Sequence, residues 1–579
     1  MRGSRRGSGA ETAAALHPDV PSPVARSPVQ LTSLDSVYLG ILAVLTLYGF
    51  HRVSLLARFR WPGGGGVEPG AGERGLDGGD ALGRAVMWDR TDGDEVALDS
   101  SGASGAGASG VSGASDSSDP SDPTEISDSR QPSEPPAGPH PGVEGVVVGG
   151  AVPFVTVQLP LFNERNVAAR LIRAVGALAW PAERLEIQVL DDSTDDTRDV
   201  VDAEVRALRE RGIDARVVRR EGRAGYKAGA LDHGLAIAKG ELICIFDADF
   251  LPDPDFLVRV APHFEDAGVG MVQSRWEHVN RDESWLTRAQ STLLDGHFVI
   301  EHKVRSDSGL YFNFNGTAGV WRRAAIDGAG GWQVDTLTED LDLSYRAQLA
   351  GWRFVYMSRL GTPAEVPPTI SSFQSQQHRW AKGSVQVARK LGLRILRADV
   401  PWRVKVEAAA HLTGNVGHPL VFGLAVLLPL SGTFRTPFGS WWHLIVFTAC
   451  TLSVFVFYDR SQRALGRSAL ARVRDVPLAI ALGIGMCVSQ TRAVLEGLVD
   501  RTGEFVRTPK RGDGTREYRD LLRGVPGLEL VMGGWFAWGL VHAVEQRTWM
   551  LLPFLILFFS GFVWVGVLSL QDWMRSLRA

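Results

Sequence analysis

The sequence predicts an α/β domain with a parallel, Rossmann-like sheet, inserted between segments that can cross a membrane. First, short apolar strands alternate with predicted helices from Pro153 to about residue 250, which is the pattern of βαβ units. Second, one apolar run lies near the N-terminus at 37–50, and several more crowd into 408–570. Third, polar clusters follow the predicted strands, and open α/β sheets bind their ligands at that edge.

Composition narrows the classes of function. The 579 residues are enough for two or three structural units. The net charge is −4 and the basic residues are scattered, so we expect no nucleic-acid partner. Cys244, Cys450 and Cys487 lie far apart in apolar surroundings, without the spacing of a metal site or a disulfide framework. We interpret them as small buried hydrophobic residues.

The first 150 residues contain a single predicted ordered segment. We expect residues 1–36, which are polar and contain proline, to be disordered, and residues 37–55 to form a transmembrane anchor. The apolar run begins too late for an ordinary cleavable signal peptide. Residues 62–150 are rich in Gly, Ser, Asp and Pro, a composition that buries too little apolar surface to offset the entropy of ordering. We predict a disordered linker there.

The domain at 151–400 begins with four predicted strands and three predicted helices. The strands are "FVTVQLP" (154–160), "LEIQVLDD" (185–192), "ARVVRR" (215–220) and "ELICIFDADF" (241–250). The helices are "VAARLIRAVGAL" (167–178), "DVVDAEVRALRERG" (199–212) and "KAGALDHGLAIAKG" (227–240). Strand ends carry "NER" (163–165), "DDSTDD" (191–196) and "DAD" (247–249). We expect these three clusters to line one ligand site beyond the sheet.

The remaining chain, 401–579, is predicted to be a membrane domain. Four stretches are long and apolar enough to span: about 408–430, 440–458, 525–545 and 549–570. A fifth run, "VPLAIALGIGMCVS" (476–489), has about 14 residues before Gln490 and Arg492 interrupt it. That length favours an amphipathic interfacial helix over 476–499 rather than a fifth span of this region.

Charge predicts about five spans in all, with the α/β domain in the cytoplasm. The basic stretches 459–474 and 501–519 can share one side with the basic tail only if 476–489 does not cross. The same side then receives the basic residues after the first anchor, which are His51, Arg52, Arg58 and Arg60. By the positive-inside rule this side is cytoplasmic, so we predict a multi-pass protein of the cell membrane.

The "DAD" cluster suits a hard cation. Alternate residues of an extended segment share a face, so Asp247 and Asp249 can point at one ion. Mg²⁺ and Mn²⁺ favour a few carboxylates together with phosphate oxygens, such as those of a nucleotide diphosphate. The alternative is an Asp-rich turn that caps the following helix, and this short motif alone is a weak signal.

Two further groups suit a nucleotide. The carboxylates of Asp191 and Asp192 can accept hydrogen bonds from a base or from ribose hydroxyls, although this segment also reads as the cap of a helix near Asp196. Lys227 begins a predicted helix, where backbone N–H groups and an ammonium together suit phosphate. A solvated surface lysine is the alternative there.

"LTEDLDLSYRAQLAG" contains a candidate general base. Thr338, Glu339 and Asp340 precede an amphipathic helix that ends near Gly351. A carboxylate at a helix N-terminus is stabilised as the anion, by about 0.3–1 kcal/mol at exposed sites. We therefore expect Asp340 to be ionised near neutral pH, as a base must be. The alternative is ordinary capping of a helix by threonine and first-turn acids.

"SFQSQQHRWAKG" (372–383) combines amides, a guanidinium and an indole just before the chain becomes hydrophobic. On a helix, Gln376, Arg379 and Trp380 lie on one face. Amides and a guanidinium bind sugar hydroxyls and phosphates, and an indole stacks on a pyranose ring. The alternative is an interfacial helix anchored by Trp and Arg at the headgroups, and both interpretations can hold together.

In this order the motifs resemble the D, DxD, TED, Q(Q/R)xRW series of the processive family 2 glycosyltransferases, the cellulose-synthase-like enzymes. "QLPLFNERN", "GYKAGAL" and "FNGTAGVWRR" look most similar to the branch that makes β-1,4-mannan or glucomannan. The resemblance covers about 150–570. It implies a GT-A nucleotide-sugar-binding domain between transmembrane helices.

The resemblance also implies roles for individual residues. Donor binding falls to Asp191 or Asp192 at the nucleoside and to Lys227, Asp247, Asp249, Gln376 and Arg379 at the diphosphate. Asp249 and Asp247 would hold Mg²⁺ or Mn²⁺, and Asp340 would be the base. The acceptor side comprises Gly316 and Thr317 in "FNGTAG" (314–319), with Glu339 and Trp380. "EFVRTPK" resembles a gating loop at 500–515, which includes Phe505, Thr508 and Lys510.

The expected activity is an inverting, metal-dependent transfer of hexose to a growing β-1,4-linked polysaccharide. GDP-mannose and UDP-glucose both fit as donors, and the expected partners are the donor, a polysaccharide or oligosaccharide acceptor and membrane lipid. One alternative is a non-processive enzyme that adds a single sugar to a lipid acceptor such as polyprenyl phosphate. A non-catalytic membrane scaffold is the other, and the complete acidic set argues against it.

Overall fold

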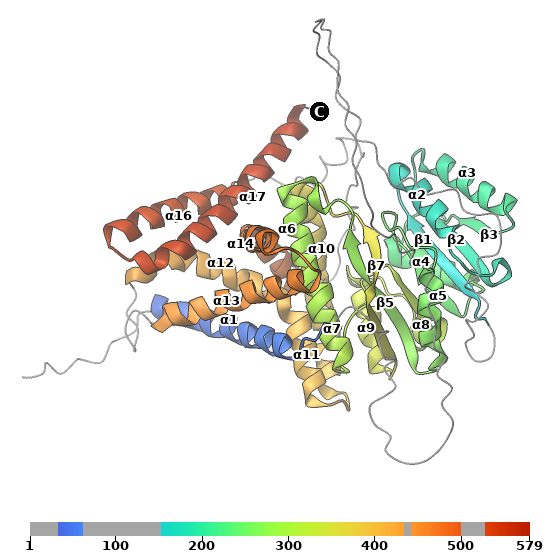
Figure 1. The fold of residues 1–579 in the computed structure, drawn as a ribbon, viewed down its shortest axis with the longest axis horizontal. Coiled ribbons are helices and arrows are strands. Elements are labelled where there is room, and N and C mark those ends of the chain that lie inside the picture. Colours follow the sequence, from blue (N-terminus) through green and yellow to red (C-terminus); the bar gives the residue numbers. More distant parts are fainter. Residues whose placement is uncertain (1–32, 62–151, 434–441, 500–526, 579) are drawn as a thin grey trace, which may run out of the picture. The chain divides into compact units, whose positions relative to one another are not determined.

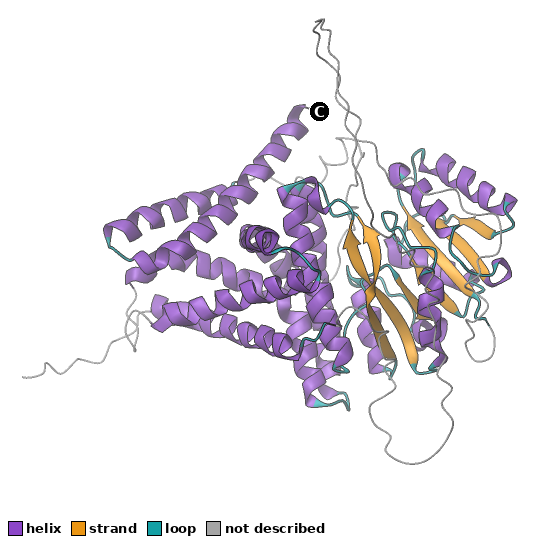
Figure 2. Cartoon of the chain, in the orientation of Figure 1, coloured by secondary structure: helices purple, strands orange, loops and turns teal. Residues whose placement is uncertain are grey.

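The computed structural model describes residues 33–61, 152–433, 442–499 and 527–578. Figure 1 traces the chain, and Figure 2 shows a β-sheet with its covering helices together with a set of long helices. The predicted linker at 62–150, the predicted gating-like loop at 500–515 and residues 1–32 of the predicted disordered N-terminus lie outside the described residues.

The α/β domain contains a seven-stranded sheet in the order β3-β2-β1-β4-β6-β5-β7. Its strands are β1 (Val155–Leu161), β2 (Leu185–Asp191), β3 (Asp214–Val218), β4 (Leu242–Ile245), β5 (Val269–His278), β6 (Gly319–Arg322) and β7 (Arg353–Ala364). The strands β3, β2, β1 and β4 pair in parallel, as the sequence predicts. β6 runs antiparallel to both of its neighbours, so the sheet is mixed rather than wholly parallel.

Helices cover both faces of this sheet. Alternate residues of β4 divide between two apolar cores, because successive side chains of a strand point to opposite faces. Cys244 shares one core with α2 (Arg165–Val175) and α3 (Thr197–Glu210). Ile243 shares the other with α4 (Tyr226–Ile237). The long apolar strands predicted from the sequence are therefore buried on both sides.

The remaining helices of the domain are mostly short. They are η1 (Ala182–Arg184), α5 (Phe256–Val260), η2 (Ala261–Glu265), η3 (Arg281–Glu283), α6 (Trp285–Asp295), α7 (Lys303–Asp307), α8 (Arg323–Gly328) and α9 (Glu339–Leu349). Of these, α5, α8 and α9 contribute to the same two cores. Between α6 and α7 the chain forms a π-helical segment, η4 (Gly296–His302). Such π-bulges are rare and occur frequently at functional sites.

Helix α10 (Ile370–Arg397) joins the α/β domain to the apolar helices. It contacts α9, α11 (Trp402–Thr413), α14 (Ala469–Val499) and α17 (Leu552–Arg578). The approach of α14 is close, because a Cβ at Gly497 would lie 2.9 Å from the carbonyl oxygen of Lys382. Helix α10, which carries the QQHRW motif, therefore packs against both the α/β domain and the apolar helices.

Four helical segments of the described chain are long and apolar enough to cross a membrane: Leu34–Arg58, Trp402–Leu430, Ala469–Val499 and Trp549–Leu577. They are built from α1 (Ser33–Arg58), α11 with η5 (Gly414–Val416), α12 (Gly417–Leu427) and part of η6 (Leu428–Thr433), α14, and η7 (Trp549–Leu551) with α17. The predicted spans at 440–458 and 525–545 are helical, as α13 (Trp442–Ala464) and α16 (Leu528–Glu545), but are not among the four.

Helix α14 differs from the prediction. The short run at 476–489 belongs to a continuous helix of 31 residues, so the length argument against a span does not hold. The polar residues that were expected to interrupt it lie inside the helix: Gln490 is buried, and Arg492 donates to Glu496 one turn further on at 2.8 Å. The contact with Glu496 thus neutralises the charge of Arg492 within the helix.

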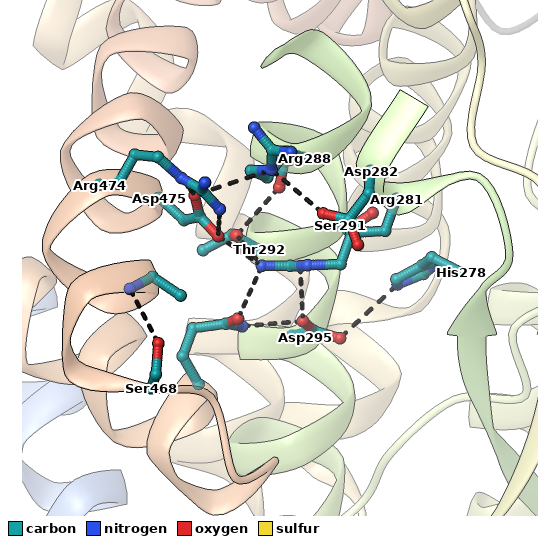
Figure 3. A network of polar contacts seen from close by, with 12 residues as sticks. His278, Arg281, Asp282, Arg288, Ser291, Thr292, Asp295, Ser468, Arg474 and Asp475 are labelled. Atoms are coloured by element: carbon teal, nitrogen blue, oxygen red, sulfur yellow. Dashed lines mark hydrogen bonds and ion pairs between the residues drawn. The ribbon is translucent and has the colours of Figure 1, made fainter. Parts of the chain in front are cut away.

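A buried polar network fastens the α/β domain to α13 and α14 (Figure 3). Arg281 of η3 lies 2.9 Å from an oxygen of Asp475 and 3.4 Å from one of Asp295. It also donates to Gln462 of α13 at 3.0 Å. Since Arg281, Asp295 and Asp475 are all at most 5% exposed, these charges depend on each other for compensation.

Candidate active site

A pocket lies at the carboxyl ends of β1, β2 and β4, bounded by the start of α9 and by α10. Glu164 follows β1, Asp192 follows β2, and Asp247 and Asp249 follow β4, and all four line the pocket. The three polar clusters that the sequence predicts to share one site are therefore brought together. This agrees with the rule that open α/β sheets bind ligands beyond their strand ends.

Lys227, at the start of α4, lies among the carboxylates of the pocket. Its Nζ is 2.5 Å from Asp247 Oδ1 and donates to the carbonyl oxygen of Gly316 at 2.9 Å. Burial lowers the pKa of Lys227, but the carboxylates of Asp247, Glu339 and Asp340 outweigh it, so the pKa is raised overall. The ammonium is therefore held in its charged form.

A hydrogen bond joins the backbone of Asp247 to the side chain of Thr317. The amide N–H of Asp247 donates to Thr317 Oγ1 at 2.8 Å, and Thr317 is fully buried. Thr317 is not among the residues that line the pocket, whereas its neighbour Gly316 is. The geometry thus places Thr317 beneath the site, supporting the "DAD" turn, rather than on the acceptor side where the resemblance puts it.

Asp191 and Asp192 have separate surroundings. Asp191 is 1% exposed, accepts from Arg219 Nε at 2.9 Å and does not line the pocket. Asp192 lines the pocket and receives two hydrogen bonds from Arg220, at 2.9 and 2.6 Å. Of the two aspartates that the sequence left as alternatives, Asp192 is the one that faces the ligand space.

Asp340 is the second residue of α9 and lies inside the pocket. Burial and then the charge of Glu339 raise the pKa of Asp340 to about 7, although Lys227 acts against them. The helix dipole predicted an anion at neutral pH, but this favourable term is smaller than the desolvation of the buried carboxyl. The result is a carboxyl poised close to neutral pH, where a general base is most effective.

Gln376, Arg379 and Trp380 all line the pocket from α10, which confirms that they share one helical face. Burial lowers the pKa of Arg379 to about 10, while Glu339 and Asp247 favour its charged form. The ring of Trp380 lies 6.4 Å from that of Trp276, centroid to centroid. A guanidinium, an amide and two indole rings therefore share this part of the pocket.

Several lining residues were missed from the sequence. Trp276 and His278 enter from the end of β5, and Arg223 stacks over the ring of Phe162 with 3.3 Å between Cζ and the ring centroid. Asn315, beside Gly316, also lines the pocket. The "FNGTAG" loop could have pointed to Asn315, but nothing local in the sequence marks Trp276, which reads as an ordinary strand aromatic.

The two remaining predictions concern the gating loop and the metal site. Phe505, Thr508 and Lys510 of the predicted gating loop lie outside the described residues. Within the described ranges, no group of three or more His, Cys, Asp or Glu side chains is arranged to hold a metal ion. Asp247 and Asp249, the two predicted ligands, both line the pocket.

Comparison with known proteins identifies similar chains. Residues 153–383 match the family model described as "Glycosyltransferase like family 2". Glucomannan 4-beta-mannosyltransferase 2 of Arabidopsis thaliana is 48% identical over 380 residues, which cover 62% of this chain and 68% of that protein. Glucomannan 4-beta-mannosyltransferase 1 of Oryza sativa subsp. japonica is 38% identical over 380 residues, covering 63% and 70%.

Solved structures give a more distant likeness. The mannosyltransferase PcManGT from Pyrobaculum calidifontis, in complex with GDP-Man and Mn²⁺, shares 21% identity with a TM-score of 0.44. The match covers 60% of this chain and 88% of that one. At this distance the likeness adds nothing to the assignment of residues.

Proposed function

This chain belongs to the cellulose-synthase-like, glucomannan-synthase branch of glycosyltransferase family 2, and on that premise we propose an inverting, metal-dependent mechanism for it. As a member, it is a processive β-1,4-glycosyltransferase that uses a nucleotide sugar. One observation carries the mechanistic proposal: a carboxyl with a pKa of about 7, Asp340, shares one pocket with the cations Lys227 and Arg379.

The donor is a nucleotide-activated hexose, either GDP-mannose or UDP-glucose. Asp192 and the Arg223–Phe162 stack lie toward the β1 and β2 ends of the pocket and suit the nucleoside. Lys227 on α4 and Arg379 on α10 both line the pocket, and their positive charges suit the diphosphate. Gln376, one turn before Arg379 on α10, can donate to the same group.

Mg²⁺ or Mn²⁺ fits the donor set of the pocket. Asp249 and Asp247 supply hard carboxylate oxygens, and these cations characteristically complete their shell with water and phosphate oxygens. Such an ion would neutralise charge on the departing diphosphate.

Transfer requires the acceptor hydroxyl to lose its proton. Asp340 takes that proton, and the hydroxyl oxygen forms a bond to the anomeric carbon as the bond from that carbon to the diphosphate breaks. Attack from the face opposite the leaving group converts an α-linked donor into a β-glycoside. Lys227 and Arg379 stabilise the negative charge that develops on the leaving group, an electrostatic term expected to be large.

The acceptor end of the glycan is held against the aromatic wall. Trp380 stacks on its terminal sugar, while Glu339 and Gly316 flank Asp340 and bound the reacting hydroxyl. Because α10 also contacts the apolar helices α14 and α17, the gripped end lies where the soluble domain meets the membrane helices. A polymer that is extended repeatedly needs its end retained at such a place.

Labelled GDP-mannose and UDP-glucose, supplied separately to membranes that contain the protein, test this function. We expect an insoluble labelled polymer. Mannanase should release the label as soluble fragments if the donor is GDP-mannose, and β-glucanase should do so if it is UDP-glucose. Label that extracts into organic solvent as a lipid carrying a single sugar would instead support non-processive transfer to lipid.

We also propose that the catalytic domain faces the cytoplasm of a multi-pass protein with about five spans. This count includes α13 and α16. It leaves α14 at the interface although that helix is long enough to span, because only then do the basic residues 459–474, 501–519 and the basic tail share one side. Cysteine labelling in sealed vesicles, with single cysteines placed at the two ends of α14, tests it. Labelling of both ends from one side supports the interfacial placement, and labelling from opposite sides would make α14 a span.

A further inference from the structure

An exposed corner forms where α10 ends and α11 begins, at residues 393–406. Four large apolar side chains of this corner are more than half exposed: Leu393, Leu396, Trp402 and Val406. Leu393 and Leu396 are three positions apart on α10, and Trp402 and Val406 are four apart on α11, so each pair shares one helical face. Exposed apolar patches that polar residues surround mark sites of interaction with a protein or a membrane.

The polar residues of the corner are mainly basic. Lys405 turns back to α10, where its Nζ donates to the carbonyl oxygen of Leu396 at 2.9 Å. The only acidic residue of 393–406 is Asp399, against four basic residues, so the corner has a net charge of +3. Three of the basic side chains are exposed guanidinium groups with no ion pair or side-chain hydrogen bond within the described ranges: Arg394, Arg397 and Arg403.

The corner lies level with the ends of two helices that are long and apolar enough to cross a membrane. The segment Trp402–Leu430 begins in the corner, and the segment Leu34–Arg58 ends close to it. The two ends meet at Glu407, whose carboxylate lies 3.7 Å from Arg58. Arg305 of α7 donates to the same carboxylate at 3.0 Å, so the α/β domain lies at this end of both helices. The corner is therefore placed where a bilayer would meet water.

A lipid surface with anionic headgroups suits both properties of the corner. At a membrane boundary, indole rings and leucine side chains enter the region between headgroups and acyl chains. Basic residues beside a spanning helix favour anionic over zwitterionic lipid, by about fivefold for each residue near the surface. A second copy of this chain is disfavoured, because a two-fold contact would bring the same positive charges together.

We propose that residues 393–406 form a docking surface for anionic phospholipid, with Trp402 inserted between the lipids and the three exposed guanidinium groups on their phosphates. This surface lies outside the pocket and takes no part in the transfer of a sugar. Because α10 is one continuous helix from Ile370 to Arg397, the lipid contact nevertheless restrains the helix that carries Arg379 and Trp380.

Photo-crosslinking of the full-length protein in phosphatidylcholine vesicles tests the surface. A trace of phosphatidylglycerol or of phosphatidylcholine, each with a diazirine on the same acyl chain, is added, and the yield on residues 393–406 is measured by peptide mass spectrometry. We expect phosphatidylglycerol to label this segment at least about tenfold more than phosphatidylcholine does, because several arginines act together. Equal labelling by the two probes would overturn the proposal. So would labelling by neither, since something other than lipid would then cover the corner.

A triple variant and a charge-matched control separate the surface from the net charge of the protein. The triple variant is Arg394→Gln, Arg397→Gln and Arg403→Gln, and we expect it to label about equally with both probes while its labelling by phosphatidylcholine stays at the wild-type yield. The control replaces three exposed arginines of η1 and α3 by Gln, namely Arg184, Arg198 and Arg206. We expect it to keep the wild-type preference. An equal loss of preference in both would contradict a local surface.

Two single variants complete the test. Arg403→Gln should lower the preference about threefold, which keeps the charge test decisive if the triple variant does not fold. Trp402→Gln should lower the labelling of the segment by both probes about fivefold and leave their ratio unchanged, because the indole no longer inserts. Wild-type yields from Trp402→Gln would show that the corner does not enter the bilayer as proposed.

Discussion

The acidic groups of the pocket differ in their surroundings, and therefore in the roles that suit them. Asp247 is paired with the ammonium of Lys227, whereas Asp340 is buried beside the like charge of Glu339. The first arrangement pairs an acidic side chain that suits a cation with an ammonium that suits phosphate, and the second raises the pKa of Asp340 to about 7. Neighbouring carboxyl groups with different environments are a common route to separate acid–base roles.

This pKa gives a pH dependence with a definite sign. A base must be deprotonated to act, so kcat/KM for the donor should increase with pH through about 7 and then level off. Below that pH we expect a decline of about tenfold per pH unit, as for a single protonation. Initial rates of polymer formation from pH 5.5 to 8.5 measure it. A flat profile across this range would contradict a base with this pKa.

Replacing Trp380 should weaken elongation more than donor hydrolysis. Trp380→Ala removes the ring that stacks on the acceptor sugar, so we expect elongation to fall roughly tenfold while donor hydrolysis changes little. Product length and released nucleotide are measured together. Trp285→Ala is the matched control, since that ring is 57% exposed and does not line the pocket. Equal losses of elongation and hydrolysis in Trp380→Ala would refute the acceptor role.

Single residues could be predicted where a motif ties residue type to strand or helix position. Asp192, Lys227, Asp249, Asp340 and Trp380 follow from such motifs, and the structure places all five in one pocket. The burial of Asp191 and Thr317 could not be predicted, because it depends on contacts with Arg219 and with the "DAD" backbone, remote in the sequence.

At the scale of elements, α10 and α14 determine how the pocket meets the membrane helices. Gly497 permits their close contact, and Arg389 Nη1 donates to the Gly497 carbonyl oxygen at 2.9 Å. At the other end of α14, Asp475 accepts from Arg281 in the network of Figure 3. The helix is therefore fastened to the α/β domain at both ends, by backbone packing at one and by charge at the other.

The charge network should contribute strongly to stability. Arg281→Met leaves the buried Asp295 without its guanidinium partner, while Asp475 keeps its ion pair with Arg474 at 2.6 Å. We therefore expect a loss of about 3 kcal/mol, the lower end for a broken buried pair. Thermal unfolding of the purified protein in detergent measures the shift of the midpoint. Arg165→Met is the control, because both partners of its ion pair with Asp196 are exposed, at 62% and 73%, and the pair should contribute about 0–1 kcal/mol. Similar midpoints for the two variants would show that the buried network is not stabilising.

Elements were predicted well where hydrophobic periodicity is local. The first three strands and the helices α2, α3 and α4 appear close to their predicted bounds. The fourth strand ends at Ile245 rather than at 250, because the "DAD" segment forms a turn closed by the hydrogen bond from Phe250 N to the Asp247 carbonyl oxygen. The reversed strand β6 was missed, because its direction depends on pairing with β4 and β5 rather than on its own four residues. α14 was read as too short, because the burial of Gln490 and the pairing of Arg492 with Glu496 appear only in three dimensions.

At the scale of the whole molecule, a nucleotide-sugar domain is built into the same compact unit as the apolar helices that flank it in sequence. Local patterns predicted this division into an α/β domain and a membrane domain, since the change from alternating strands and helices to long apolar runs is abrupt. The number of spans could not be fixed in this way, because length and composition alone select α14 but not α13 or α16.

The central claim is that Asp340 is the base of a glycosyl transfer carried out in this pocket. Asp340→Asn keeps the size of the side chain and removes its basicity, and the most direct measurement pairs polymer formation with equilibrium binding of the donor nucleotide. We expect polymer formation to fall by about 10³-fold while the dissociation constant of the nucleotide changes by less than about threefold. Polymer formation at the wild-type rate by Asp340→Asn would contradict the account.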